Sequence, residues 1–119
     1  MDIIHGTRND LHVTKVDESH AKNLDKMIIF GPDKGWPGHA MRLMSIGTGG
    51  ASFNHKHAHP HWVYVTEGEG TVTIEGTVYP APKGSYVMIP GELQHCLENT
   101  GATPFEFICC IPVTKKEDA

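Results

Sequence analysis

The sequence predicts a small all-β domain, on three observations. From Ala40 onward, short runs of alternating or apolar residues recur between Gly- and Pro-containing turns, which is typical of a β-sandwich or barrel. The 119 residues include 13 Gly and 8 Pro, which favours many turns over long helices. No segment longer than ten residues keeps a helical period. A chain of this length is expected to form one domain around one core.

Residues 1–39 are expected to supply an edge strand and an ordered loop that pack on the barrel. Residues 12–16 (HVTKV) alternate, and residues 26–30 (KMIIF) form a short apolar run. The turn-rich sequence GPDKGWPGH follows this run. Four histidines of this region are expected to be solvated: His5, His12, His20 and His39.

Residues 40–112 are expected to carry the barrel. Its first strand is predicted at 40–46, stopping at the glycines of 47–50. A hairpin is predicted within 71–82, turning at Glu75–Gly76, and its prolines disfavour a central position in a sheet. Further strands are predicted at 61–66, 85–90, 95–99 and 104–112. In the strand 61–66, Trp62 and Tyr64 are expected to point outward. Residues 113–119 form a charged tail that is expected to fray.

Composition excludes several classes of function. The net charge is −4 with no basic run, which argues against a nucleic-acid partner. No stretch approaches 18 consecutive apolar residues, so no membrane span is predicted. The N-terminus lacks the basic and apolar regions of a signal peptide. Three cysteines, two of them adjacent, make a poor disulfide framework, so a cytoplasmic location is expected.

Four of the nine histidines fall within seven residues: His55, His57, His59 and His61. In an extended chain their alternation would place all four on one face, although Pro60 interrupts a simple strand. Imidazoles this close together suit a transition metal better than an apolar core. His95, in the stretch YVMIPGELQHCLEN, is the expected further ligand. The alternatives are a His-rich surface loop that binds metal adventitiously, and an ion that only holds the barrel together.

This spacing resembles the paired motifs of the cupin superfamily. The first family motif, G-x5-H-x-H-x3-4-E-x6-G, has its counterparts here in Gly49, His55, His57, His61 and Gly68, with a histidine replacing the acidic residue. The second motif, G-x5-P-x-G-x2-H-x3-N, has its counterparts in Gly84, Pro90, His95 and Asn99. Glu92 stands at the inner glycine of that motif, which a turn tolerates if φ stays negative.

A group of small single-domain microbial cupins has the same four-histidine set and an ending similar to FICCIP. The resemblance implies a jelly-roll (double-stranded β-helix) barrel that holds one divalent transition metal per chain: Fe, Ni, Zn, Cu or Mn. The implied ligands are His55, His57, His61 and His95. Such a set leaves two positions open on a six-coordinate ion, and neutral imidazoles leave its +2 charge uncompensated.

Three further side chains are candidates for a catalytic or binding role. His59 lies between the implied ligands and is a candidate proton acceptor. Arg42, flanked by apolar strand residues, either forms a structural ion pair or binds a substrate carboxylate. Cys109 lies on the expected inner face of the last strand, where it is either a small buried apolar residue or approaches the cavity.

Two classes of function stay open. In the first, the protein is a metal-dependent enzyme of the dioxygenase, lyase or isomerase type, acting on a small oxygen-containing substrate that chelates the metal. In the second, it is a non-catalytic module that binds a small ligand or senses metal. Barrels of this family commonly pair, and the strand KMIIF has the character of one that covers a neighbour's sheet edge, so a homodimer is expected.

Overall fold

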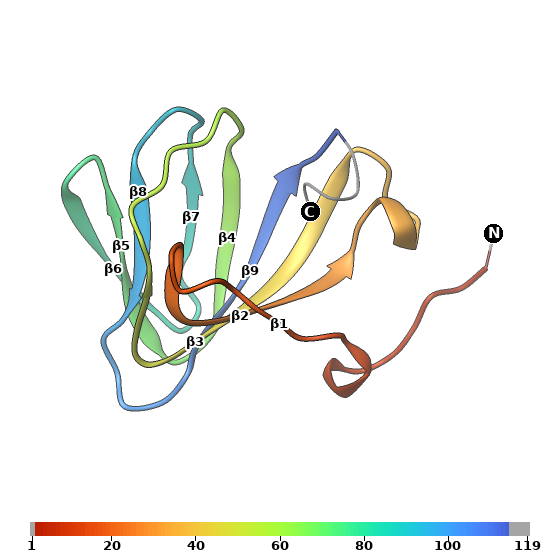
Figure 1. Ribbon diagram of the computed structural model, residues 1–119, viewed down its shortest axis with the longest axis horizontal. Coiled ribbons are helices and arrows are strands. Elements are labelled where there is room, and N and C mark those ends of the chain that lie inside the picture. Colours follow the sequence, from red (N-terminus) through yellow and green to blue (C-terminus); the bar gives the residue numbers. More distant parts are fainter. Residues whose placement is uncertain (1, 115–119) are drawn as a thin grey trace.

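The computed structural model describes residues 2–114 and confirms the all-β prediction, since nearly all of its regular structure belongs to one antiparallel sheet that curls into a barrel (Figure 1). The strands are β1 (Thr14–Lys15), β2 (Ala21–Phe30), β3 (His39–Ser52), β4 (His61–Glu67), β5 (Glu69–Ile74), β6 (Thr77–Pro82), β7 (Tyr86–Ile89), β8 (His95–Asn99) and β9 (Phe105–Pro112). Two 3-10 segments complete the described part, η1 (Arg8–Asp10) and η2 (Pro32–Lys34), and neither comes near the length of a membrane-spanning helix.

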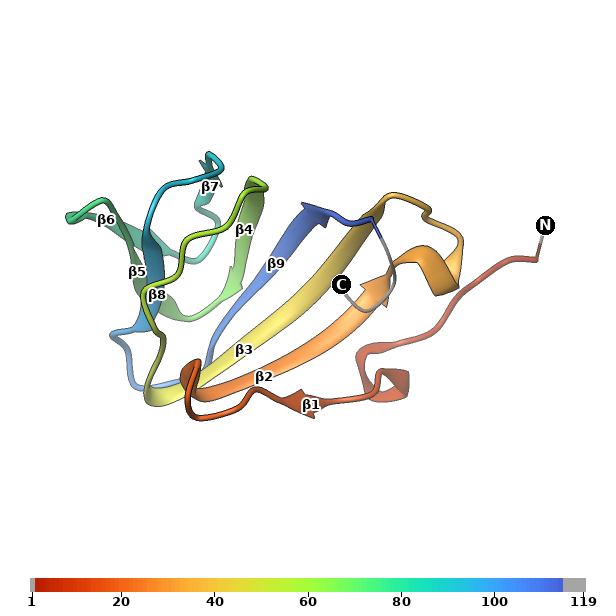
Figure 2. The ribbon, with the colours of Figure 1, turned by 45° about the horizontal axis from the view of Figure 1, so that its top comes forward.

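Strand β3 connects the two halves of the barrel. It pairs with β2 and β9 along most of its length and meets β8 at Ala51↔Glu98, as its long diagonal course shows (Figures 1 and 2). The expectation that this strand stops at the glycines of 47–50 is therefore wrong. Close packing against β2 explains Gly50, because a Cβ there would lie 2.9 Å from the Cβ of Asn23. Gly50 thus lets β3 continue where a side chain would collide with its neighbour.

Side chains alternate between the barrel interior and its outside as predicted for β4. His61, Val63 and Val65 are buried, whereas Trp62 and Tyr64 are exposed. The inward residues of β9 are all buried: Phe105, Phe107, Cys109 and Ile111. The interior is therefore an apolar core that includes one histidine of the predicted ligand set on β4.

Two edges of the sheet, at β6 and at β1–β2, also follow the sequence. The hairpin β5–β6 turns at Glu75 and Gly76, both with positive φ (47° and 81°), and the proline-containing β6 ends the strand order. Beside β3, off this strand order, β2 extends the predicted KMIIF strand toward the N-terminus. The short strand β1 pairs with it only at Thr14↔Lys26 and Lys15↔Asp25. In the described part, no strand pairs with residues 27–30 of β2 on that side.

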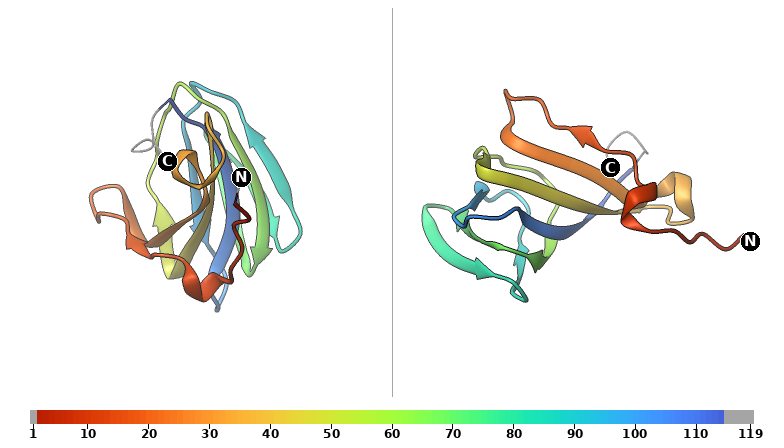
Figure 3. Two further views of the ribbon diagram at one scale, coloured as in Figure 1. Left: turned by 90° about the vertical axis from the view of Figure 1, so that its right-hand side faces the viewer. Right: turned by 90° about the horizontal axis from the view of Figure 1, so that it is seen from below.

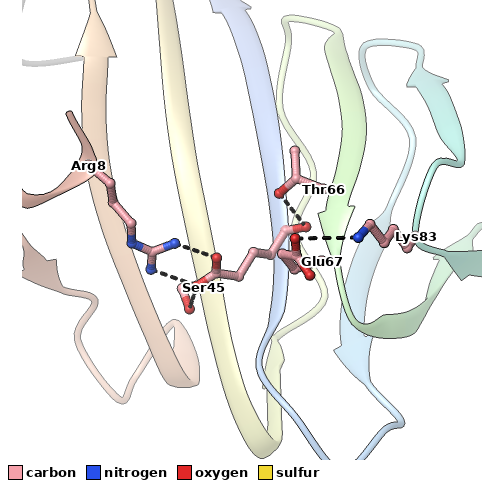
Figure 4. A network of polar contacts seen from close by, with 6 residues as sticks. Arg8, Ser45, Thr66, Glu67 and Lys83 are labelled. Atoms are coloured by element: carbon pink, nitrogen blue, oxygen red, sulfur yellow. Dashed lines mark hydrogen bonds and ion pairs between the residues drawn. The ribbon is translucent and has the colours of Figure 1, made fainter. Parts of the chain in front are cut away.

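The N-terminal segment lies outside the barrel, along the outer side of β2 and β3 (Figures 2 and 3). A polar network fixes it there (Figure 4). Both terminal nitrogens of the Arg8 guanidinium donate to the Glu106 carboxylate, Nη2 at 2.6 Å, and the Ser45 hydroxyl donates to the same carboxylate at 2.7 Å. These bonds, from Arg8 above all, hold the pKa of Glu106 below its ordinary value of 4.5.

We expect Glu106→Gln to lower the free energy of unfolding by about 1–3 kcal/mol at pH 7, because charge-assisted bonds are lost at a largely buried carboxylate. The half-exposed Arg8 places the effect toward the lower end of that range. A folded-state pKa below the unfolded one contributes stability above the unfolded pKa, and that stability is lost as the pH falls through the folded pKa.

Urea unfolding at pH 7 and at steps below pH 4.5, the ordinary value for this carboxyl, checks this prediction. The difference in the free energy of unfolding between the wild type and Glu106→Gln should shrink as the pH falls. Glu67→Gln is the matched control, because Glu67 and Lys83 form an exposed pair 3.6 Å apart. A wild-type-to-variant difference that stays constant across the pH series would contradict the assignment.

Residues 115–119, which include most of the predicted charged tail, lie outside the described residues. Val113, the first residue of that predicted tail, is buried, and its N–H donates to the carbonyl of Gly38 at 2.9 Å.

Candidate metal centre

The loop between β3 and β4, residues 53–60, runs beside β8 and is attached to it by backbone hydrogen bonds (Figure 1). His55 and His95 exchange two N–H···O bonds of 2.9 and 2.8 Å. The N–H of Glu92 donates to the carbonyl of His57 at 2.6 Å. These attachments bring the histidine-rich loop against the start of β8, where His95 stands.

The turn before β8 is shaped to receive this loop. A Cβ on Gly91 would overlap the carbonyl oxygen of Ala58, so only glycine allows this approach. Glu92 has a φ of 70°, so the condition of a negative φ, under which a turn would tolerate a residue other than glycine here, is not met. Left-handed backbone costs a non-glycine residue roughly 1–2 kcal/mol. In this conformation the N–H of Glu92 reaches the carbonyl of His57.

Three of the predicted ligands come together: His57 from the loop, His61 from β4 and His95 from β8. One ring nitrogen from each lies within 4.8 Å of the others. The ring centroids are 4.8 Å apart for His61–His95, 5.2 Å for His57–His61 and 5.5 Å for His57–His95. Their spacing on three different segments gives a convergent set of nitrogen donors, which is the arrangement that binds a transition metal.

Hydrogen bonds orient two of these rings with Nε2 toward the cluster. The Nδ1 of His61 lies 3.3 Å from the Cys109 sulfur, and the Nδ1 of His95 lies 3.1 Å from the Leu93 carbonyl. An Nδ1–H that donates to a second group leaves Nε2 as a lone pair for a metal. The Nε2 of His61 is buried and has no hydrogen-bond partner among the described residues. A metal ion would satisfy that atom, so the residues present fit the metal that the resemblance implies.

Burial and mutual repulsion keep these imidazoles neutral. Desolvation, followed by the neighbouring histidines and Arg42, lowers the pKa of His57 to about 4 and that of His61 to about 3. Desolvation likewise lowers the pKa of His95. All three rings are therefore unprotonated at neutral pH, which is the form that coordinates a metal.

His55 and His59 are placed differently from those three. The Nε2 of His55 lies 2.9 Å from the carbonyl oxygen of His20, and His55 is outside the group of converging nitrogens. The His59 ring stacks on His57 at 5.1 Å with an 8° angle between planes, and lies 5.0 Å from the His61 ring. The tract histidines therefore do not all converge, as the interruption at Pro60 indicated.

Two hollows border the cluster. One is an interior cavity of about 340 Å³, lined by apolar side chains such as Leu97 and Phe107 and by the three histidines. The other is a wider opening of about 640 Å³, lined in part by His57, His59 and His61. The cluster thus lies between the barrel interior and its mouth.

Arg42 and Cys109 lie at the inner side of the cluster, facing each other from β3 and β9. The Nη2 of Arg42 donates to the Cys109 sulfur at 3.1 Å, while its buried Nε has no hydrogen-bond partner in the described part. Within residues 2–114 no ion pair to Arg42 is found. Cys109 is buried and borders the cavity, and its sulfur contacts both Arg42 and His61. Its candidate catalytic role stays a prediction.

Sequence reasoning overlooked the backbone groups that build the centre. The carbonyls of His20 and Leu93 bind histidine rings, and Glu92 holds the loop. No sequence pattern identifies such carbonyls. Asn99 is the last residue of the second motif, and its side-chain amide holds the backbone in place. It donates to the carbonyls of Ile46 and Thr103, both at 2.9 Å.

Among curated proteins, an uncharacterized protein of Methanocaldococcus jannaschii is 30% identical over 66 residues, which is 55% of this chain and 53% of that protein. The mannose-1-phosphate guanylyltransferase of Salmonella montevideo is 37% identical over 62 residues, 52% of this chain and 13% of that enzyme. This chain thus spans about half the length of the first protein and a small part of the second.

Solved structures show the same fold. The polyketide cyclase RemF from Streptomyces resistomycificus has a TM-score of 0.84 at 20% identity, over 97% of this chain and 80% of that one. A predicted oxalate decarboxylase from Thermotoga maritima has a TM-score of 0.83 at 19% identity, over 92% and 99%. The family model Cupin_2, described as a cupin domain, matches residues 42–111. The chain, with its single-domain jelly-roll barrel, therefore belongs to the cupin family.

Proposed function

We propose that this protein is a metal-dependent enzyme acting on a small oxygen-containing molecule that chelates the metal. The observation that carries the proposal is the buried Nε2 of His61, which has no hydrogen-bond partner within residues 2–114. It lies with His57 and His95 beside a cavity of about 340 Å³. The reaction class proposed is that of a dioxygenase, lyase or isomerase. The cyclase and the predicted decarboxylase among the related folds support the fold and leave the reaction to experiment.

His57, His61 and His95 would hold the ion, with His55 as the proposed fourth ligand. For His55 to join them, its ring must leave the carbonyl of His20. The proposed ion is one divalent Fe, Ni, Zn, Cu or Mn per chain, since imidazole suits the later metals best. Bound there, it would polarise a carbonyl or hydroxyl oxygen of the substrate.

The chain's own residues supply the surroundings of the reaction. Apolar side chains of the interior cavity, including Val63, Leu97 and Phe107, would exclude water from the reacting end of the substrate. His59 is the proposed proton acceptor, because it lies at the mouth with its ring against both His57 and His61. No carboxylate is found among the described residues that line either hollow.

Metal analysis of protein purified without a histidine tag tests the proposal. We expect about one divalent ion per chain, and small oxygen-containing acids or ketones should raise the melting temperature only when the metal is bound. Turnover of a stabilising compound would establish the enzyme. A protein that retains no ion, and whose melting temperature no added divalent metal raises, would refute the site. Metal and ligand binding without turnover of any compound would instead indicate the non-catalytic module.

A homodimer is the proposed assembly, on the basis of the β2 edge that β1 leaves largely unpaired. Light scattering is expected to give about twice the 13.1 kDa chain mass. A mass near that of one chain across a wide concentration range would contradict it.

A further inference from the structure

The interior cavity holds two cations beside the histidine cluster. Arg42 on β3 and Lys26 on β2 both line it, on the inner face of paired strands. Burial, and then repulsion by Arg42, lower the pKa of Lys26. Burying the Arg42 cation in an apolar barrel is costly, so its position calls for a compensating anion.

The walls of the two hollows offer Arg42 no carboxylate. None of the described residues that line them is Asp or Glu. The Arg42 guanidinium instead contacts the Cys109 sulfur, a weak acceptor whose pKa is raised by burial. Its Nε is buried without a hydrogen-bond partner in the described part. Arg42, which lines both hollows, thus has donor capacity that the neighbouring side chains of the described part do not use.

We propose that the cavity takes a small carboxylic acid whose carboxylate binds Arg42, with Lys26 as a second, longer-range cation. The metal-chelating oxygen belongs to the other end of the same molecule, and this part rests on the proposed function. The substrate class is then an oxo or hydroxy acid rather than a neutral ketone or alcohol.

The geometry suits a short acid. The Cys109 sulfur lies 3.1 Å from the Nη2 of Arg42 and 3.3 Å from the Nδ1 of His61. The guanidinium is therefore close to the ring of a proposed metal ligand. A cavity of about 340 Å³ is at the small end of ligand sites. Its apolar wall, including Met44 and Ile89, would contact the hydrocarbon part between the two ends. A guanidinium binds a carboxylate through two parallel hydrogen bonds, which an amide cannot reproduce.

Calorimetric titration with pyruvate and with pyruvamide tests the proposal, since the two differ in the carboxylate and share the keto oxygen. The variants are R42M, R42K and, as a matched control, K22M, which removes an exposed cation from β2. R42M is expected to weaken pyruvate binding roughly 10- to 100-fold and pyruvamide binding less than twofold. R42K keeps the positive charge but cannot form the two parallel hydrogen bonds of a guanidinium, so its affinity for pyruvate should lie between those of R42M and the wild type. K22M should bind pyruvate like the wild type.

Each titration is run on metal-free and zinc-loaded protein, which separates the two proposals. A pyruvate-over-pyruvamide preference that disappears in R42M supports the carboxylate site in either form. If zinc loading changes neither affinity while that preference persists, the proposed function fails and the carboxylate site stands. If zinc binds and R42M leaves the preference intact, the inference is overturned and the proposed function stands. Tighter pyruvate binding by tenfold or more in E117Q/D118N would identify the chain's own acids as the occupant and also overturn it.

Discussion

Replacing His95 with alanine is expected to remove most of the bound divalent ion. His95 is buried, 5% exposed, and its Nδ1 is held by the Leu93 carbonyl, so its Nε2 is fixed in the cluster. Losing such a ligand should weaken metal affinity by more than the roughly 10- to 100-fold that follows loss of an outer partner. Metal content after dialysis, with competition by a chelator of known affinity, measures the effect.

The control is His59→Ala. His59 is near the cluster in sequence and in space, yet lies outside the group of converging nitrogens. Its loss should leave metal affinity within a few-fold of the wild type. His55→Ala distinguishes a three-histidine from a four-histidine site, because an intermediate loss of metal affinity would support His55 as a fourth ligand. Equal losses from His59→Ala and His95→Ala would place the ion on a different set of histidines. Melting curves without metal show whether each variant folds.

The core of the candidate site was predictable because its ligands are tied to regular features of the chain. His61 begins a strand whose alternation fixes its side chain inward, and the buried Val63 and Val65 confirm that face. His95 begins a strand after a turn signal, and its distance from Pro90 matches the family motif. The hairpin at Glu75–Gly76 was equally plain, since this pair of residues favours a tight turn. Local patterns of this kind are independent of distant contacts.

The features that the sequence did not predict depend on contacts between segments that pack together only in the folded protein. The direction of the His55 ring is set by a carbonyl on His20, 35 residues away in the chain. Strand β3 continues through its glycines because β2 packs against it, although glycine alone favours a break. Glu92 takes a left-handed φ because the loop above it accepts its N–H, and composition alone favours the opposite sign. Tertiary packing decided each of these.

Gly91→Ala is expected to displace the metal-binding loop. The added methyl group would overlap the carbonyl of Ala58, a backbone atom between His57 and His59. Either the loop or the turn must move, which typically costs about 1–3 kcal/mol of folding stability. The hydrogen bond from Glu92 to His57 is next to the clash, so His57 should leave its position opposite His95.

Gly91→Ala should weaken metal binding more than it lowers the free energy of unfolding, because the clash lies in the loop and the barrel core is untouched. Gly47→Ala is the matched control: a Cβ there meets only Asn23, at an ordinary 3.5 Å. Paired measurements of urea unfolding without metal and of metal affinity distinguish the effects. A G91A protein that binds metal as tightly as the wild type would mean that the loop adjusts without moving His57. In that case the close approach of Gly91 would serve the fold alone, and the position of His57 would be set by its bridge through His55 to β8.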